Sequence, residues 1–295
     1  MKENKKIQSK VSVVIPTYKG KSLMEKNFPS VLKSLRSGDE VVIVDDGGFK
    51  ETLEWLKQNF KLKQSKKNND YTLYKNEFSQ GKKKISITYV VNHTTLRFAA
   101  NSNRGVELAS HPLIFLVNDD VSLYPDTIKK LVPHFSNKQV FAVGCLEFDH
   151  EHGGVKSGKN KLWFERGMFV HSKAADFKRG KTAWASGGSG MFDRQKWLQV
   201  GGLDLAYYPA YWEDIDLSAT ARERGWQVLF EPDARVDHNH ETTNTDVFGQ
   251  NKIRKISWRN ANVFTWKHSD VWQKIAYLLW KPYWLIARLR AKIKA

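Results

Sequence analysis

Three carboxylates stand within four positions of a 295-residue chain, directly after an aromatic run. Glu213, Asp214 and Asp216 belong to the stretch YYPAYWEDIDLSATARERGW at 207–226, and they mark the predicted start of a helix. Acidic residues in a first helical turn interact favourably with the helix dipole, which would explain the charge but not the aromatic and proline residues before it. A carboxylate beside such an aromatic wall can instead act as a general base toward an acceptor hydroxyl.

A second acidic cluster, LVNDDV at 116–121, follows a run of apolar and β-branched residues. Aspartate is common in turns, so the cluster is compatible with a polar turn that closes a strand. Oxygen ligands at a strand end also suit Mg²⁺ or Mn²⁺, which keep waters and bridge to substrate phosphates. VDDGG at 44–48 has two interpretations as well: a strand-to-loop turn, or an aspartate that accepts hydrogen bonds from a base or a ribose.

Two histidines, His238 and His240, follow the predicted strand VLFEPDARV. A lone histidine is more often structural than a metal ligand. Two histidines at this spacing, in a chain with a separate acidic site, favour a ligand role, since imidazole can bind Mn²⁺ although carboxylate suits it better.

Alternating strands and helices are expected to position these clusters. The polar, basic segment 61–84 between them is predicted to be a loop or a surface insert. The order predicts an α/β fold with a mostly parallel sheet. Both acidic clusters then lie at carboxyl ends of strands, where open sheets bind ligands. Apolar runs predict strands at 10–18, 39–48, 85–92, 111–121 and 140–148, and helical spacing predicts helices at 22–35, 51–60, 97–110 and 127–135.

The net charge of +17 is concentrated in three regions. Residues 1–10, 56–84 and 251–295 carry +3, +7 and +10, and the remainder of the chain is slightly acidic. This distribution predicts that the basic periphery of the molecule contacts an anionic surface of a partner. It does not predict a basic groove through the middle of the molecule. The single cysteine, Cys145, excludes an intramolecular disulfide and favours an intracellular protein.

The C-terminal segment 251–295 is rich in Trp, Tyr, Lys and Arg. It suits a helix packed on the domain with a solvated basic face. It equally suits an interfacial anchor with aromatic residues at headgroup depth and cations toward anionic lipid. No run approaches the roughly 20 apolar residues of a spanning helix. Aromatic and basic tracts also bind single-stranded nucleic acid, but no nucleic-acid motif accompanies this one, so no nucleic acid partner is expected.

The order of the motifs is more specific than any one of them. VSVVIPTY, EVVIVDDGG, RFAANSNRG, FLVNDDV, GGLD, YWEDIDL, EPDARVDHNH and WRN with KHSD together strongly resemble the family 2 glycosyltransferases of GT-A fold, over roughly residues 10 to 270. The resemblance implies a GT-A catalytic domain over 1–250, with a central sheet flanked by helices, and a C-terminal helical extension over 251–295. It implies an inverting enzyme that uses Mg²⁺ or Mn²⁺ to move a single sugar from a nucleoside-diphosphate sugar to a hydroxyl of a glycan or lipid-linked glycan.

The resemblance also implies roles for individual residues. Asp214 would be the catalytic base, and Glu213 beside it would hold acceptor or sugar hydroxyls. Asp120 would bind the metal, and His238 would approach the metal or the diphosphate. The nucleotide sugar would lie against Pro16, Thr17, Tyr18, Asp45, Asp46, Arg97, Asn103, Asn118 and Asp119, and the acceptor against Gly188, Trp212 and Glu213.

One departure from the family pattern is that Asn118 occupies the first position of the D-x-D element. The missing charge implies either weaker metal binding or compensation by Asp119. Such variants resemble rhamnosyltransferase-like members, which act in cell envelope polysaccharide synthesis. A Q-x-x-R-W element is missing, which favours a single-addition enzyme over a processive synthase.

Rival hypotheses make different predictions. A non-catalytic nucleotide-sugar or carbohydrate-binding protein of the same fold would need no base, so removing the charge of Asp214 would change no chemistry. A nucleotidyltransferase would release pyrophosphate in place of a nucleoside diphosphate. If the C-terminal segment docks on a membrane, we expect a cytoplasmic protein, peripheral on the inner face of the cell membrane.

Overall fold

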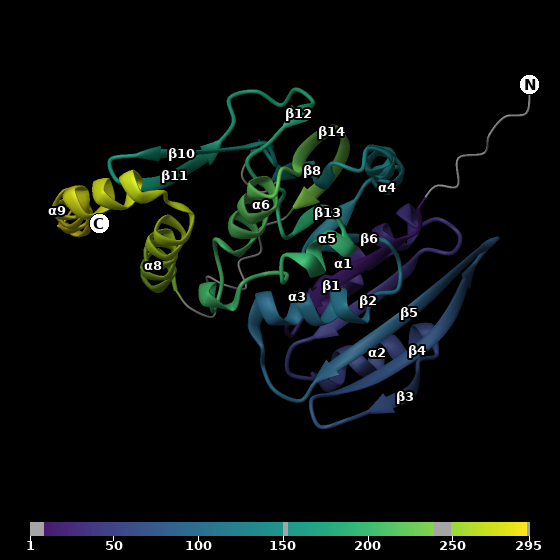
Figure 1. Cartoon of the computed structure of the whole chain (residues 1–295). Coiled ribbons are helices and arrows are strands. Elements are labelled where there is room, and N and C mark those ends of the chain that lie inside the picture. The colour runs from purple at the N-terminus through teal and green to yellow at the C-terminus, as the bar shows by residue number, and fades with distance from the viewer. Residues whose placement is uncertain (1–8, 150–152, 239–248, 294–295) are drawn as a thin grey trace, which may run out of the picture.

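The computed structural model describes residues 9–149, 153–238 and 249–293 (Figure 1). The strands of its large sheet are β1 (Val11–Thr17), β2 (Glu40–Asp45), β3 (Lys63–Lys67), β4 (Tyr71–Gln80), β5 (Lys83–Asn92), β6 (Leu113–Val117), β7 (Val121–Leu123), β8 (Val140–Asp149), β9 (Val155–Ser157), β12 (Gly180–Lys181), β13 (Ser189–Asp193) and β14 (Gln227–His238). Their order across the sheet is β12-β14-β8-β13-β6-β1-β2-β5-β4-β3, with β7 beside β14 and β9 beside β8.

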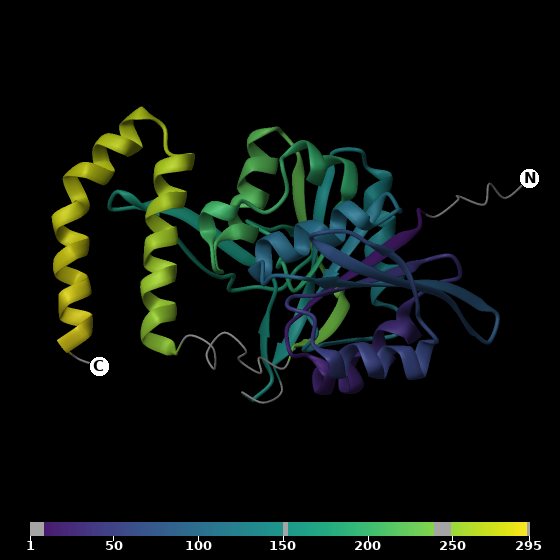
Figure 2. The same cartoon turned by 90° about the horizontal axis from the view of Figure 1, so that it is seen from below.

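The helices cover this sheet and extend beyond it. They are α1 (Lys21–Ser34), α2 (Lys50–Phe60), α3 (Arg97–Leu108), α4 (Thr127–Leu131), α5 (Arg194–Gln199), α6 (Glu213–Glu223), α8 (Gln250–His268) and α9 (Val271–Ile293), with 3₁₀ helices η1 (Val132–Ser136) and η2 (Leu205–Tyr207). A separate hairpin of β10 (Asn160–Glu165) and β11 (Met168–Lys173) reaches toward the C-terminal helices. Figures 1 and 2 both place α8 and α9 side by side at one end of the molecule, with β3 to β5 at the other.

The centre of the sheet is parallel, as the apolar runs predict. β1 pairs in parallel with β2 and β6, and β2 with β5. Every residue of β1, β2 and β6 is buried, because helices cover both faces. The parallel register brings the carboxyl ends of these strands to one edge, where Thr17 pairs with Asp45 and Asn118 follows β6 directly.

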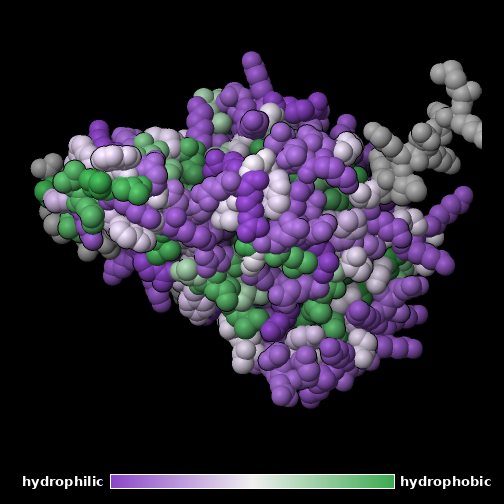
Figure 3. All heavy atoms as spheres, in the orientation of Figure 1, coloured by the Kyte–Doolittle hydropathy of each residue, from purple (hydrophilic) through white to green (hydrophobic). Residues whose placement is uncertain are grey.

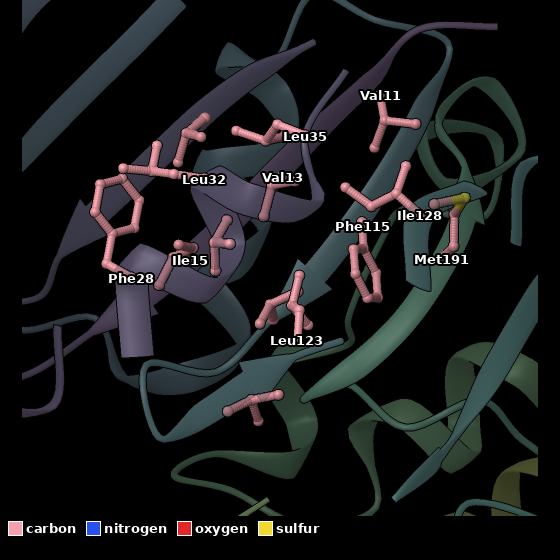
Figure 4. Close-up of a cluster of buried hydrophobic side chains, with 14 of the residues drawn as sticks. Val11, Val13, Ile15, Phe28, Leu32, Leu35, Phe115, Leu123, Ile128 and Met191 are labelled. Carbon is pink, nitrogen blue, oxygen red and sulfur yellow. The ribbon is translucent and has the colours of Figure 1, made fainter. Parts of the chain in front are cut away.

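Two apolar clusters hold the helices on the sheet. On one face Val11, Val13 and Ile15 pack with Phe28 and Leu32 of α1 (Figure 4). On the other face Val14, Val42 and Val44 pack with helix α3 and with Leu217 of α6. Alternate residues of one strand enter opposite clusters because successive side chains of a strand point to opposite faces.

The prediction of a mostly parallel sheet is wrong. Within the described residues, four strand pairs of the large sheet are parallel and seven are antiparallel. Strand β13 enters between β6 and β8 and runs antiparallel to both, which accounts for two of the seven pairs, and β4 accounts for two more. The sequence SGMFD is short and opens with a small residue and a glycine, so it gives little periodic signal.

The segment 61–84, predicted to be a loop or a surface insert, is not a loop. The segment forms β3, β4 and the start of β5, an antiparallel extension of the sheet. Leu73 enters one apolar cluster while Tyr74 and Phe78 pack against the other, so β4 is a true alternating strand. Its lysines hide this alternation in the sequence. They suit an edge, since exposed lysines on β3 discourage pairing with a second chain.

Two smaller differences concern element ends. The helix predicted at 127–135 ends as α4 at Leu131 and continues as the 3₁₀ helix η1, which contains Pro133. The strand predicted at 111–121 divides into β6 and β7, and Asn118, Asp119 and Asp120 occupy the turn between them. No helix within the described residues combines the length and the apolar character needed to cross a bilayer.

Candidate functional site

The carboxyl ends of β1 and β2 form the first part of the site. Asp45 is completely buried and accepts hydrogen bonds from the Tyr89 hydroxyl and, at 3.1 Å, from the Phe49 backbone N–H. Burial raises the pKa of Asp45 to about 6, although these hydrogen bonds oppose the rise. Its Oδ1 has no hydrogen-bond partner among the described residues. A buried acceptor of this kind suits a donor supplied by a ligand.

The neighbouring Asp46 positions Arg97. Its two carboxylate oxygens accept the backbone N–H groups of Leu96 and Arg97, at 2.6 and 2.8 Å, at the start of α3. Arg97 has a left-handed backbone, with φ of 67°, and its guanidinium lies 5.8 Å from the centre of the Tyr18 ring. Asp46 therefore holds a strained residue beside the Tyr18 ring at the end of β1.

Asn103 lies on α3 but uses its amide within the protein. Its Nδ2 donates to the Leu203 carbonyl at 2.8 Å, and its Oδ1 accepts from the Leu203 N–H at 2.9 Å. The pair ties α3 to the GGLD turn. Contact between Asn103 and a nucleotide sugar stays a prediction.

The turn at 118–120 is fixed from two sides. Thr17 donates to Asp119 Oδ2 at 2.5 Å, and the Asn118 N–H donates to the Gly188 carbonyl at 3.0 Å. A Cβ on Gly20 would lie 2.2 Å from Asp119 Oδ2, so only glycine fits there. Burial raises the pKa of Asp119 to about 7, although the Thr17 hydrogen bond opposes the rise. The Asp119 carboxylate is thus hydrogen-bonded to Thr17 at the end of β1.

Asp120 is turned toward His238, the last residue of β14. Asp120 Oδ1 lies 3.3 Å from His238 Nε2, and Glu147 Oε1 of β8 lies 3.9 Å from His238 Nδ1. Burial alone would lower the pKa of His238, but Asp120 and Glu147 outweigh it and raise the pKa to about 10. His240, also considered as a ligand, lies outside the described residues.

Glu147 is a site residue that the sequence analysis missed. Burial alone would raise its pKa, but His238, Ser189 and Ser157 outweigh burial and lower the pKa to about 2. The two serine hydroxyls donate to its carboxylate at 2.5 and 2.8 Å. The only available signal was an acid inside the apolar strand VFAVGCLEF, which needs buried partners.

The donor set fits a divalent cation that shares its coordination with a substrate. A carboxylate is a suitable ligand for Mg²⁺ or Mn²⁺, and an imidazole is a suitable ligand for Mn²⁺. No group of three or more His, Cys, Asp or Glu in the described parts of the chain could hold a metal alone. A pair of protein ligands agrees with a cation that also needs waters and substrate phosphates.

Two consecutive glycines connect this pair to the carboxylates of α6. The Gly187 N–H donates to Asp214 Oδ2 at 3.1 Å. A Cβ on Gly188 would lie 2.8 Å from Asn118 Nδ2 and 3.3 Å from a ring carbon of His238. Residues 187 and 188 therefore touch both halves of the site, and Gly188 fits because it has no side chain.

Glu213 and Asp214 begin α6 as predicted, and their environments differ. Asp214 accepts from Gly187 and, at 2.8 Å, from the Ile215 N–H, and burial raises its pKa to about 6. Glu213 is more deeply buried. Burial and the charge of Asp214 raise its pKa to about 8, and its Oε2 has no hydrogen-bond partner among the described residues. Burial thus disfavours the charged form of both carboxyl groups, and it does so more strongly for Glu213 than for Asp214.

The turn before α6 is strained and is held by α8. Tyr211 and Trp212 both have left-handed backbones, with φ of 75° and 79°. Asn260 of α8 donates from Nδ2 to the carbonyls of Tyr207, Ala210 and Tyr211, at 3.0, 2.9 and 2.7 Å. Strain of this kind persists only where the surroundings enforce it. Asn260 thus gives the WRN motif a positioning role that its sequence did not reveal.

Trp212, directly before α6, packs between the β10–β11 hairpin and α8. Its ring is buried and contacts His171 and Phe264, with ring centres 4.9 and 5.1 Å apart. Behind it, Asp216 accepts from the Tyr207 hydroxyl and pairs with Lys267 and His268, at 2.8 to 2.9 Å. The KHSD motif therefore fastens α8 to α6.

Known proteins resemble this chain in sequence and in fold. The family described as "Glycosyl transferase family 2" matches residues 12–198. The O-antigen chain rhamnosyltransferase RfbN of Salmonella typhimurium is 24% identical over 247 residues, which are 81% of this chain and 69% of RfbN. The uncharacterized protein y4gI of Sinorhizobium fredii is 23% identical over 79% of this chain, which spans only 24% of y4gI.

Two solved structures share the arrangement of elements. GalNAc-T7 with UDP, GalNAc and Mn²⁺ superposes with a TM-score of 0.58 at 15% identity, over 80% of this chain and 44% of that one. The mannosyltransferase PcManGT of Pyrobaculum calidifontis, with GDP-Man and Mn²⁺, superposes with a TM-score of 0.56 at 13% identity, over 97% of this chain and 80% of that one. These likenesses show the GT-A fold. Because the family match spans well over half of the chain, the protein belongs to glycosyl transferase family 2.

Proposed function

We propose that this protein transfers a single sugar from a nucleoside-diphosphate sugar to a hydroxyl of a glycan acceptor, with inversion at the anomeric carbon. The observation that carries the proposal is the Gly187–Gly188 connection. One glycine holds the Asp214 carboxylate, and the next packs against Asn118 and His238. The carboxylate that would act as the base is thus held by the residue next to the one that packs against Asn118 and His238, whose side chains would face a diphosphate. A protein that only binds a nucleotide sugar does not need this arrangement.

The nucleotide sugar would lie along the carboxyl ends of β1, β2 and β6. The buried oxygen of Asp45 can accept a hydrogen bond from a base N–H, and the Tyr18 ring with Arg97 offers a stacking face and a positive charge. Pro16, Thr17, Asp46, Asn103, Asn118 and Asp119 complete the predicted donor side. Because the Asp119 carboxylate accepts a hydrogen bond from Thr17, we propose that it shapes the turn and does not bind the metal. Asn118 carries no charge, so this turn offers a metal one negative charge fewer than a turn with aspartate at position 118.

Asp214 would act as general base. Its ionised carboxylate takes the proton of the acceptor hydroxyl while the oxygen forms a bond to the anomeric carbon. The bond from that carbon to the diphosphate oxygen breaks, and the electron pair leaves with the nucleoside diphosphate. One base suffices because no glycosyl-enzyme intermediate forms, unlike in retaining hydrolases. Glu213, neutral at pH 7, can donate a hydrogen bond to an acceptor or sugar oxygen.

Asp120 and His238 would hold Mg²⁺ or Mn²⁺. The cation would supply charge that stabilises the leaving diphosphate. Glu147 would orient the imidazole, since carboxylates commonly accept from the far nitrogen of a ligating histidine. His238 must lose its proton to bind a metal, so in its protonated form it would instead face the diphosphate as a cation.

The likeness to RfbN supports a donor of the deoxyhexose or hexose class and a role in cell envelope polysaccharide synthesis. Nucleotide sugars are made in the cytoplasm, so we place the reaction at the inner face of the membrane.

A nucleoside-diphosphate release assay tests the proposal. The purified chain receives Mg²⁺ or Mn²⁺ and a panel of nucleotide sugars, and Asp214→Asn and Asp120→Ala serve as comparison variants. We expect release from one donor, slow without acceptor, and lost in both variants. Donor binding without release by the wild type would favour the non-catalytic alternative, and release of pyrophosphate would favour a nucleotidyltransferase.

A further inference from the structure

Helix α9 exposes an apolar stripe that nothing in the described chain covers. Trp272 and Leu279 are 78% and 75% exposed, and they share one side of the helix with further exposed apolar residues: Val271, Ile275, Leu278, Tyr283 and Ile286. The spacing of three and four residues places them on one broad arc. Figure 3 shows this apolar surface at the end of the molecule formed by α9. A contiguous exposed patch of this kind marks an interaction site.

Positive charge lines the edge of this stripe. Lys274 and Lys281 lie between the apolar arc and the side of α9 that packs on the protein, where Tyr277 and Trp284 contact the third apolar cluster. Residues 271–295 contain no Asp or Glu. Apolar residues flanked by lysines are typical of helices that lie in the interface of a bilayer, with the cations at the headgroups.

Two adjoining cavities open between α8, α9 and the β10–β11 hairpin. One has a volume of about 430 Å³ and is lined by Lys255, Arg259 and Lys281 together with Trp258, Tyr277 and Trp284. The second, of about 470 Å³, shares Met168, Trp258 and Trp284 with the first and adds Arg254. Among the described residues, neither cavity has an acidic side chain in its lining. Cations among aromatic rings suit a ligand that is both anionic and apolar.

The second cavity reaches the wall of the candidate active site. It is lined by Trp212 and His171, whose rings are in contact, and Trp212 directly precedes Glu213 and Asp214. The hairpin turn closes the other side, since a Cβ on Gly167 would lie 2.6 Å from the Ala276 carbonyl of α9. The cavities therefore adjoin Trp212 on one side and helix α9 on the other.

We propose that these cavities bind the phosphate or diphosphate head of a membrane lipid that carries the acceptor glycan. Lys255 and Lys281 pair with the phosphate oxygens, and Arg259, whose Nε and Nη2 donate to Asn260 and to the Ala206 and Tyr208 carbonyls, adds positive charge beside them. The aromatic residues cover the first part of the lipid chain, and the rest of the chain enters the bilayer beside the α9 stripe. The glycan then extends past Trp212 toward Asp214. This inference rests on the proposed function, because it names the carrier of the acceptor.

Vesicle binding tests the site without requiring catalysis. The full chain is sedimented with phosphatidylcholine vesicles that contain either polyprenyl diphosphate or phosphatidylglycerol, matched for total negative charge. We expect at least roughly tenfold tighter binding to the polyprenyl diphosphate vesicles. Lys255→Glu with Lys281→Glu should abolish this preference. The matched control, Lys63→Glu with Lys67→Glu on the exposed strand β3, makes the same charge change and should keep it.

A second variant separates the head site from the apolar stripe. Trp272→Ser with Leu279→Ser should weaken binding to both kinds of vesicle, because it removes apolar surface from the interface. Equal binding of the wild type to the two matched vesicles would overturn the proposal, as would a preference that survives Lys255→Glu with Lys281→Glu. Donor release by the wild type is measured in parallel. Its absence, with the lipid preference intact, would overturn the transfer reaction but support the lipid site.

Discussion

Two adjacent carboxyl groups, Glu213 and Asp214, have different acidities because their surroundings differ. Asp214 receives two backbone N–H groups at the start of α6, whereas the Glu213 Oε2 is buried without a hydrogen-bond partner in the described structure. The pKa of Asp214 is raised to about 6 and that of Glu213 to about 8. Pairs separated in this way commonly divide acid and base roles between them.

The pH dependence of transfer should follow this pair. A base must be deprotonated, so kcat/KM should fall about tenfold per pH unit below pH 6, where Asp214 gains its proton. Above about pH 8 Glu213 loses its proton, can no longer donate, and the rate should fall again. A rate profile measured with saturating metal checks this. A profile that is flat through pH 6 would contradict Asp214 as the base.

Glu213→Gln separates the two roles. Glutamine has the size of a neutral glutamic acid and can still donate, so transfer at pH 7 should fall by less than roughly tenfold. The descending limb near pH 8 should vanish because no titrating group remains there. Glu213→Ala is the comparison and should lose more activity. If glutamine and alanine are equally damaging at pH 7, ionised Glu213 has the essential role.

Gly188→Ala tests the contact between the two halves of the site. The added Cβ would lie 2.8 Å from Asn118 Nδ2, so the metal turn or His238 must move. We expect roughly 100-fold lower kcat/KM, because small displacements at a reacting centre are costly. Gly144→Ala on β8 is the matched control, since its Cβ would meet neighbours at an ordinary 3.5 Å or more. Steady-state kinetics with thermal unfolding compares the two, and near-normal activity of Gly188→Ala would refute the assignment.

At the residue scale, the charged side chains of the candidate site could be predicted from the sequence. The residues that position them through hydrogen bonds could not. The pairing of Asp120 with His238 follows from acids and histidines at strand ends, a recognisable pattern. Glu147 and Asn260 act through buried partners far away in the chain, such as Ser189 and the Tyr211 carbonyl. Such contacts exist only after folding, so spacing could not reveal them.

At the scale of elements, α8 keeps the catalytic turn in place. Asn260→Ala would leave the carbonyls of the 207–211 turn without their donor, which should lower the free energy of unfolding by roughly 1–3 kcal/mol. Tyr211 and Trp212 could then relax from their left-handed backbones, so kcat should also fall. Denaturant unfolding and donor release measure both effects. Asn59→Ala, an exposed amide on α2 that bonds one carbonyl, is the control and should change neither.

The elements themselves were predictable where burial sets the pattern. The central strands β1, β2 and β6 are fully buried, so their apolar runs could be recognised directly. β3 and β4 form a lysine-rich edge, and β13 is a five-residue insertion, so neither gives a clear period. Pairing with neighbours, not local propensity, makes these segments strands.

At the scale of the whole molecule, the two C-terminal helices differ in how they join the catalytic body. Phe264 and Asn260 of α8 are completely buried, whereas most residues of α9 between 271 and 286 are exposed. A chain ending after Asp270 should therefore fold and release nucleoside diphosphate from its donor. A chain ending after Gly249 should be unstable, since burial of Phe264 alone contributes about 3–5 kcal/mol. Thermal unfolding of both truncated chains decides this, and equal stability would make α8 a separate extension.

The basic ends of the sequence have a structural counterpart at this scale. The described cations of 251–293 lie on α8 and α9, which form one end of the molecule. Those of 56–84 lie mainly around the β3–β4 edge at the other end. The acidic centre between them contains the candidate site. Composition could place charge at the periphery, but only the fold separates the two regions in space.

The central claim is that Asp214 is the base of sugar transfer. The most direct measurement compares wild type and Asp214→Asn for nucleoside-diphosphate release and, by calorimetry, for donor binding in the presence of Mn²⁺. We expect a loss of at least roughly 1,000-fold in release, with donor affinity nearly unchanged. Release within about tenfold of wild type, or donor binding lost together with release, would contradict it.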